Sequence, residues 1–327
     1  MKLFAVFFAV IALFGAVAAT RDEEPKDPVV VAYQDLIAKD LRLATVGYHL
    51  AKGSADFCRN KWRNPGWVLH DERQYPDLAL ARRVFTFRQP ISIAAVVKGG
   101  PAHRAGLITG DGLFGVDGSV VLYGPAPEHH QPSSERIDGL RDEFATRLSE
   151  GRPIPFQIDT AKGRRDFLLD PPAICASDFW VDARAKRDAG ADGARVRVTS
   201  GLIDYVLDDE ELAAVVAHEM AHNLLDHRPL IEATKSGKTK VIKTTEAEAD
   251  RLSVWLMANA GYDPEAAITF WQRYGKATGL GIFSAPTHYR WQTRAAMLRE
   301  EIGLMARSSA NEGPHDPPLL AAHRAKQ

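Results

Sequence analysis

The stretch "LDDEELAAVVAHEMAHNLLDH" (residues 207–227) decides how the second half of the chain folds. Asp208 is a typical helix N-cap, and Glu211 stands three residues after it, as in a capping box. Apolar residues follow at intervals of three and four, which is the spacing of one face of a helix. The pattern predicts a helix over 209–227.

His218 and His222 stand four positions apart in this predicted helix. Their side chains are therefore about 40° apart around the axis and about 6 Å apart along it, so both imidazoles can bind one metal ion. Glu219 is next to the first histidine and can reach a water on that ion without being a ligand. This H-E-x-x-H arrangement is typical of zinc peptidases, in which zinc lowers the pKa of its water and the glutamate moves the proton. A pair of surface histidines on a charged helix is the alternative.

The last histidine of the stretch, His227, is predicted to lie outside this site. On a continuous helix it is about 180° around the axis from His218, and we expect it near the helix C-terminus, where a cation is favoured. A metzincin would have glycine and histidine three and six positions after the second histidine. Leu225 and Arg228 stand there instead, which excludes that class.

The third metal ligand is predicted on a second helix, "TTEAEADRLSVWLMANAGYDP" (244–264). Glu246 and Asp250 are four apart and share a face, so Glu246 can complete a His-His-Glu site. Asp250 can then accept a hydrogen bond from a ligating imidazole and fix its tautomer. Glu248 points about 160° to 200° away from that face and is the weaker candidate. Acidic residues that merely favour a helix N-terminus are the alternative.

The remaining sequence predicts an α+β fold in which a β-rich segment interrupts a mainly helical protein. Residues 28–76 begin with a long amphipathic helix, and helices return over 171–307. Between them, 77–170 contains short apolar runs broken by Gly and Pro, with one helix at 135–149. A loose tail is expected over 308–327.

Composition is that of a folded protein, with 45% hydrophobic residues, 25% charged residues and a net charge of −1. This balance gives no indication of a nucleic-acid partner.

Residues 1–19 differ from the rest of the chain. Lys2 is followed by an apolar run that ends in small residues, which predicts a cleavable secretory signal. We therefore expect an exported, most directly periplasmic protein with no stable membrane span after cleavage. Secretion or a retained signal anchor are the alternatives.

Export would favour a disulfide between Cys58 and Cys175, the two cysteines of the chain. They flank the β-rich segment, so the bond would tie its two connections together. In the chain-entropy model such a long loop is worth about 4–5 kcal/mol. Two separate buried thiols are the alternative.

The motifs "HEMAH" and, further along, "EAEAD" resemble metallopeptidase family forty-eight, the gluzincins that include HtpX, Oma-type and periplasmic quality-control peptidases. The resemblance covers roughly 30–56 and 176–305. It implies one zinc ion per chain in a mainly helical peptidase domain with a small edge sheet. Carried over to this chain, the resemblance makes His218, His222 and Glu246 the zinc ligands. Glu219 is then the general base, and Asp250 is the acid that supports a ligand.

The same resemblance implies further parts of the site. "ARVRVT" (194–199) resembles the family's edge strand, along which a substrate backbone would lie antiparallel. "SAPTHYRWQTR" (284–294) resembles a Thr-His segment, which implies that His288 polarises the scissile carbonyl or masks the resting metal, supported by Arg294. A surface histidine is the alternative. A single candidate membrane segment and the β-rich insert depart from the family pattern.

The insert has a resemblance of its own. "VVKGGPAHRAGLITGDGLFGVDG" (96–118) is similar to the signature of bacterial PDZ domains. That implies a PDZ-like domain which takes extended peptides by strand addition. The groove is expected near "FRQPISIAA" (87–95) and the helix 135–149. Pro90 removes a backbone donor there, which leaves peptide binding open.

Together these features predict an exported zinc metalloendopeptidase whose PDZ-like module captures or gates polypeptide substrates, such as unfolded chains or C-terminal peptides. A role in protein quality control is implied by the family alone. A peptide-binding adaptor or chaperone with a latent or inactive protease site is the alternative. A redox metalloenzyme is disfavoured, because it would not require Glu219 between the histidines.

Overall fold

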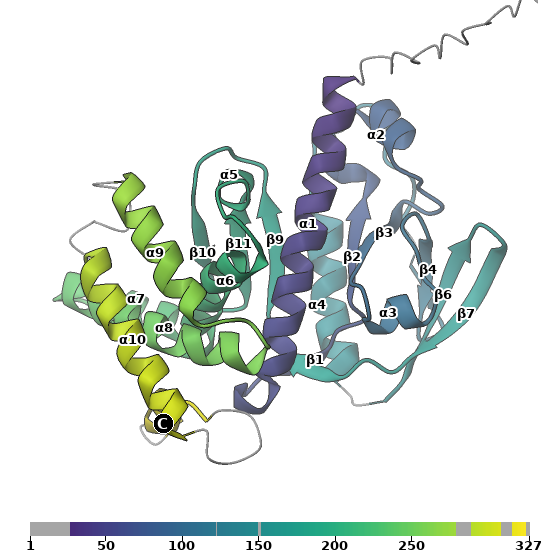
Figure 1. The fold of residues 1–327 in the computed structure, drawn as a ribbon. Coiled ribbons are helices and arrows are strands. Elements are labelled where there is room, and N and C mark those ends of the chain that lie inside the picture. Colours follow the sequence, from purple (N-terminus) through teal and green to yellow (C-terminus); the bar gives the residue numbers. More distant parts are fainter. Residues whose placement is uncertain (1–26, 122, 150–151, 279–288, 309–315, 325–327) are drawn as a thin grey trace, which may run out of the picture.

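The computed structural model describes residues 27–121, 123–149, 152–278, 289–308 and 316–324. A helical unit and a β-rich unit lie on either side of the long helix α1 (Pro28–Gly53), and each has its own hydrophobic core (Figure 1). The mixture of helices and strands agrees with the predicted α+β class. The predicted signal segment lies outside the described residues.

The helical unit packs around α6, which is buried on nearly every side because its middle is made of small and apolar residues. Val216 and Met220 have no exposed surface, and Trp255 is the largest of the fully buried side chains. None of the helices in the described ranges is both long and apolar enough to cross a membrane. The helices around α1 are α5 (Ser200–Ile203), α6 (Asp209–Leu224), α7 (His227–Ala233), α8 (Lys238–Asn259), α9 (Glu265–Thr278), α10 (Trp291–Ser308) and α11 (Pro318–Arg324).

The expected loose tail contains one ordered element. Residues 318–324 form α11, which packs against α8, and Leu320 is only 3% exposed. An apolar pair in "PPLLAAH" that can be buried against α8 explains this difference from the prediction.

A three-stranded sheet lies beside α6 in the order β10-β11-β9. The strands are β9 (Asp178–Asp182), β10 (Ala189–Ala191) and β11 (Arg195–Thr199), with β11 antiparallel to β10 and parallel to β9. The predicted edge strand 194–199 is therefore the central strand, and β10 and β9 are the two edges. A tight hairpin at residues 192–194 joins β10 to β11 and so places β10 beside it. In this hairpin the side chain of Asp192 accepts hydrogen bonds from two backbone amides, and Gly193 has a φ of +103°.

The β-rich unit is an antiparallel sheet in the order β2-β3-β4-β6-β7, with a short strand β5 beside β4. It begins at Trp67 rather than at residue 77, because β2 pairs with β3 and Leu69 enters the core of this unit. Its elements are β2 (Trp67–Asp71), α2 (Leu78–Val84), β3 (Ile91–Val96), α3 (Pro101–Arg104), β4 (Gly112–Val116), β5 (Ser119–Val120), α4 (Glu135–Ser149), β6 (Ile154–Thr160) and β7 (Gly163–Leu169); short 3-10 turns span Ala55–Phe57 and Glu72–Gln74.

The chain enters and leaves the β-rich unit at one place. Strands β1 (Lys61–Arg63) and β8 (Ala173–Cys175) pair antiparallel there. Beside them Cys58 and Cys175 form a disulfide across a sequence separation of 117, with their Cα atoms 5.4 Å apart. The two connections of the unit are thus joined both by hydrogen bonds and covalently.

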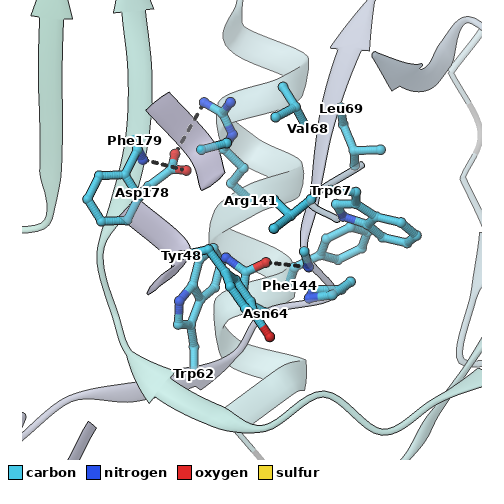
Figure 2. Close-up of a pocket in the computed structure, with 14 residues that line it drawn as sticks. Tyr48, Trp62, Asn64, Trp67, Val68, Leu69, Arg141, Phe144, Asp178 and Phe179 are labelled. Atoms are coloured by element: carbon cyan, nitrogen blue, oxygen red, sulfur yellow. Dashed lines mark hydrogen bonds and ion pairs between the residues drawn. The ribbon is translucent and has the colours of Figure 1, made fainter. Parts of the chain in front are cut away.

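The peptide groove predicted near residues 87–95 does not agree with the strand order of the β-rich unit. Strand β3 is paired on both sides, by β2 and β4, so no peptide can add to residues 91–96. The edge strand next to α4 is β2. The end of β2 and α4 line a cavity of about 60 Å³ together with Tyr48 and Phe179 of the helical unit, and Arg141 of α4 pairs with Asp178 of β9 at 3.3 Å (Figure 2). This side of β2 and α4 therefore faces the helical unit.

Gly53 allows helices α1 and α8 to approach closely. A Cβ at this position would lie 2.4 Å from the carbonyl oxygen of Asn259 and 2.7 Å from the Cα of Ala260. Because both neighbours are backbone atoms, no side-chain rotation relieves the clash. We expect Gly53→Ala to lower the free energy of unfolding by about 1–3 kcal/mol, measured by urea denaturation.

Gly139→Ala is the matched control for this substitution. Gly139 lies within α4 with nothing inside 4 Å of its Cβ position. Alanine there should raise the free energy of unfolding by about 0.5–1 kcal/mol, because glycine loses more conformational freedom in a helix. Equal effects of the two substitutions would contradict the close packing of α1 on α8.

Candidate metal centre

Helix α6 presents the H-E-x-x-H residues because of how it begins. The side chain of Asp208 accepts a hydrogen bond from the backbone N–H of Glu211 at 2.9 Å, and the Glu211 carboxylate accepts one from the N–H of Leu207 at 2.9 Å. This reciprocal cap starts the helix at Asp209, as the sequence predicts. The two histidines then fall in its last two turns.

The predicted ligands are brought together. The Nε2 atoms of His218 and His222 are 3.3 Å apart, and oxygens of Glu246 lie 3.3 Å from the first and 3.5 Å from the second. A tetrahedral zinc ion with bonds of about 2.0–2.1 Å separates its ligand atoms by about 3.4 Å. In the described part of the chain, these three residues are the group that could hold a metal ion. Two imidazoles and one carboxylate can hold a divalent transition metal such as zinc.

His218 is held from behind by a buried carboxylate. Its Nδ1 lies 3.0 Å from Asp250, and Arg294 donates from Nε to the same carboxylate at 2.7 Å and also from Nη2. The Arg294 guanidinium lies 3.5 Å from the centre of the Trp271 ring. Arg294 therefore supports Asp250, whereas the sequence had suggested support of His288. His288 itself lies outside the described residues.

The charges around the ligands favour a cation. Burial opposes a charge on His218, but hydrogen bonds and charges of Asp250 and Glu246 outweigh it and raise the pKa of His218 to about 10. Burial lowers the pKa of His222 to about 3, with the neighbouring charge of His218 adding to the effect. Metal binding would displace the proton of His218 and is therefore expected to release it.

Glu219 lies next to the ligands without contributing to them. It is 7% exposed, and burial raises the pKa of its carboxyl to about 7. A carboxyl group in this range can take up and return a proton near neutral pH.

His227 is not among the ligand residues, but the prediction that it lies on the far side of a continuous helix was wrong. Helix α6 ends at Leu224, Asp226 takes a left-handed conformation with φ of +52°, and α7 begins at His227. His227 is 2% exposed and contacts His222. Pro229 carried the missed signal, because proline is tolerated in the first turn of a helix but not in its interior.

An open cleft of about 540 Å³ leads to the metal centre. One wall is the edge strand β10, with Ala189, Gly190 and Ala191, and the other includes Arg228 and Ile231 of α7. Because β10 carries only small side chains, an extended chain can approach its backbone closely.

Comparisons with known proteins also indicate a metallopeptidase. Residues 186–234, which contain β10, β11, α5, α6 and α7, match the model of peptidase family M48. The chain is 27% identical over 133 residues to the mitochondrial metalloendopeptidase OMA1 of Arabidopsis thaliana, and 28% identical over 142 residues to that of Schizosaccharomyces pombe. The matches cover 32% and 33% of this chain and only 27% and 41% of those relatives. The segment with His218, Glu219 and His222 is therefore similar to peptidase family M48, and Glu246 lies beyond the matched residues.

Proposed function

We propose that this protein is a zinc-dependent metalloendopeptidase that hydrolyses peptide bonds of polypeptide substrates. The convergence of two imidazole nitrogens and a carboxylate at 3.3–3.5 Å, beside the buried Glu219, is the observation that carries the proposal. The match to family M48 and the similarity to two metalloendopeptidases support it.

The residues of the site divide the chemistry among them. When bound, zinc would supply Lewis acidity, which polarises a carbonyl oxygen and lowers the pKa of water. Glu219 would take the proton from the attacking water and give it to the leaving amine. The edge of β10 would hold an extended substrate by backbone hydrogen bonds, which favours unfolded polypeptides as substrates.

The β-rich unit is proposed to be PDZ-like and to gate access rather than to bind peptides freely. In support, the groove between β2 and α4 faces α1 and β9, and the Arg141–Asp178 ion pair joins the two units there. A peptide would have to displace these contacts before it could add to β2. Export to the periplasm and a quality-control role are parts of the same proposal.

Casein cleavage tests the proposed activity. Protein from residue 20 onward should bind one zinc per chain and cleave β-casein, lose the activity with 1,10-phenanthroline, and regain it on addition of zinc. Zinc content is measured by mass spectrometry of the metal, and cleavage by gel electrophoresis. One zinc per chain without cleavage of casein or of reduced, unfolded lactalbumin would overturn the peptidase and favour the adaptor.

A further inference from the structure

His227 and Glu248 form a connected pair behind the metal centre. The Nδ1 of His227 lies 3.0 Å from the Nδ1 of His222, and its Nε2 lies 3.2 Å from a carboxylate oxygen of Glu248. We propose that this pair positions His222 for metal binding. The inference rests on the metal role proposed above and adds two positioning residues to it.

The direction of the hydrogen bonds follows from the position of the ligand atoms. His222 directs Nε2 towards His218 and Glu246, so Nε2 is the nitrogen that would bind the metal. A neutral imidazole that binds through Nε2 carries its proton on Nδ1 and must donate it. The partner facing that N–H is the Nδ1 of His227.

His227 can accept this proton only with a lone pair on Nδ1, so its own proton is on Nε2. That N–H points to Glu248, whose carboxylate accepts it. Each ring nitrogen of the two histidines thus has one defined role. The chain of hydrogen bonds selects a single tautomer and ring orientation of His222.

Burial makes these contacts specific. His227 is 2% exposed, and its ring meets that of His222 edge-on with centroids 4.9 Å apart. A buried N–H without a partner is costly, so an apolar replacement of His227 would leave His222 free to rotate towards another acceptor. Glu248, whose side chain is 33% exposed, connects the chain to solvent.

The two ligating histidines are therefore supported differently. His218 faces the fully buried carboxylate of Asp250, whereas His222 faces a neutral ring and reaches a carboxylate only through it. A carboxylate directly against His222 would place a further negative charge beside Glu246 and Asp250. The imidazole supplies the acceptor without that charge.

Zinc affinity and the spectrum of the cobalt-substituted protein test this role. We expect His227→Phe, which keeps the ring shape but removes the acceptor, to raise the zinc dissociation constant by about 10–100-fold, measured by competition with a chelator. The visible absorption bands of bound Co²⁺ should shift, because the ligand field changes when His222 turns. His227→Asn should recover most of the affinity, since its side-chain oxygen can accept the Nδ1 proton.

Matched controls separate this role from a general loss of histidine or charge. His103→Phe and Glu300→Gln alter exposed residues outside the site and should leave zinc affinity unchanged. Should His227→Phe fail to fold, as judged by circular dichroism, Glu248→Ala carries the test and should also weaken zinc binding.

Zinc binding by His227→Phe within twofold of wild type, with an unchanged cobalt spectrum, would overturn the proposal. Asparagine behaving like phenylalanine would overturn it too, as would unchanged binding by Glu248→Ala if that variant carries the test. Wild-type protein that binds no zinc would instead defeat the proposed function, before any variant is compared.

Discussion

Glu219→Gln is expected to retain one zinc per chain and to cleave β-casein about 10³–10⁴-fold more slowly than the wild type. Glutamine has nearly the shape of glutamate, so the tight packing around this 7% exposed side chain is kept. It cannot take up a proton, and the attacking water would lose its base. Because Glu219 is not among the three ligands, the metal content should not change. Rates are measured at fixed protein concentration, with zinc determined on the same samples.

Glu232→Gln is the matched control, because Glu232 is exposed in the wall of the same cleft. It removes the same charge without touching the ligands, and most of the activity should remain. Glu219→Gln protein that keeps more than a tenth of the wild-type rate would show that another group acts as the base.

Arg294→Met is expected to lower the free energy of unfolding of the metal-free protein by about 3–5 kcal/mol. Arg294 is 3% exposed and Asp250 is 1% exposed, and the two are joined by two hydrogen bonds. Methionine fills a similar volume but leaves the carboxylate of Asp250 buried with less compensation. Asp250 would then be a weaker partner for His218, so zinc affinity should fall as well. Urea denaturation measures the first effect and chelator competition the second.

Two further variants show whether the loss comes from the buried charge. Arg299→Met changes an exposed arginine on the same helix and should alter stability by less than about 0.5 kcal/mol. Asp250→Asn combined with Arg294→Met removes both charges and should recover part of the stability. A loss below about 1 kcal/mol in Arg294→Met, or no recovery in the double variant, would contradict this account.

The ligand residues could be predicted from the sequence because their geometry is local. A spacing of four places His218 and His222 on one helical face wherever that helix lies, and the same rule pairs Glu246 with Asp250. Their meeting across α6 and α8 requires tertiary packing, but the apolar faces of both helices leave few other arrangements.

His227 escaped prediction because its position depends on where α6 ends. Extending the helix to residue 227 rotates this side chain away from the ligands, whereas the break at Asp226 brings it back to them. Glu248 is not among the ligand residues, as predicted, but its contact with His227 could not be predicted without knowing where α6 ends. The helix ends three residues earlier than predicted, and this difference decides whether His227 contacts His222.

The strand order could not be predicted for a different reason. A hydrophobic pattern identifies a strand but not its neighbours. Here the chain passes through α2 after β2 and comes back as β3, which pairs antiparallel with β2 on one side and with β4 on the other. In the small sheet, the pair Asp192-Gly193 is a hairpin signal. Given that signal, β10 rather than β11 is the strand available at the edge.

The disulfide between Cys58 and Cys175 also affects the folding of the chain. Helix α1 packs on α6 and α8, although the whole β-rich unit separates them in sequence. Bringing such distant segments together costs loop-closure entropy and slows folding. Once Cys58 and Cys175 are joined, the 117-residue separation is bypassed, and α1 lies a short covalent path from the helices that it contacts. When the disulfide forms before α1 packs on α6 and α8, that packing closes a much shorter loop and costs less entropy.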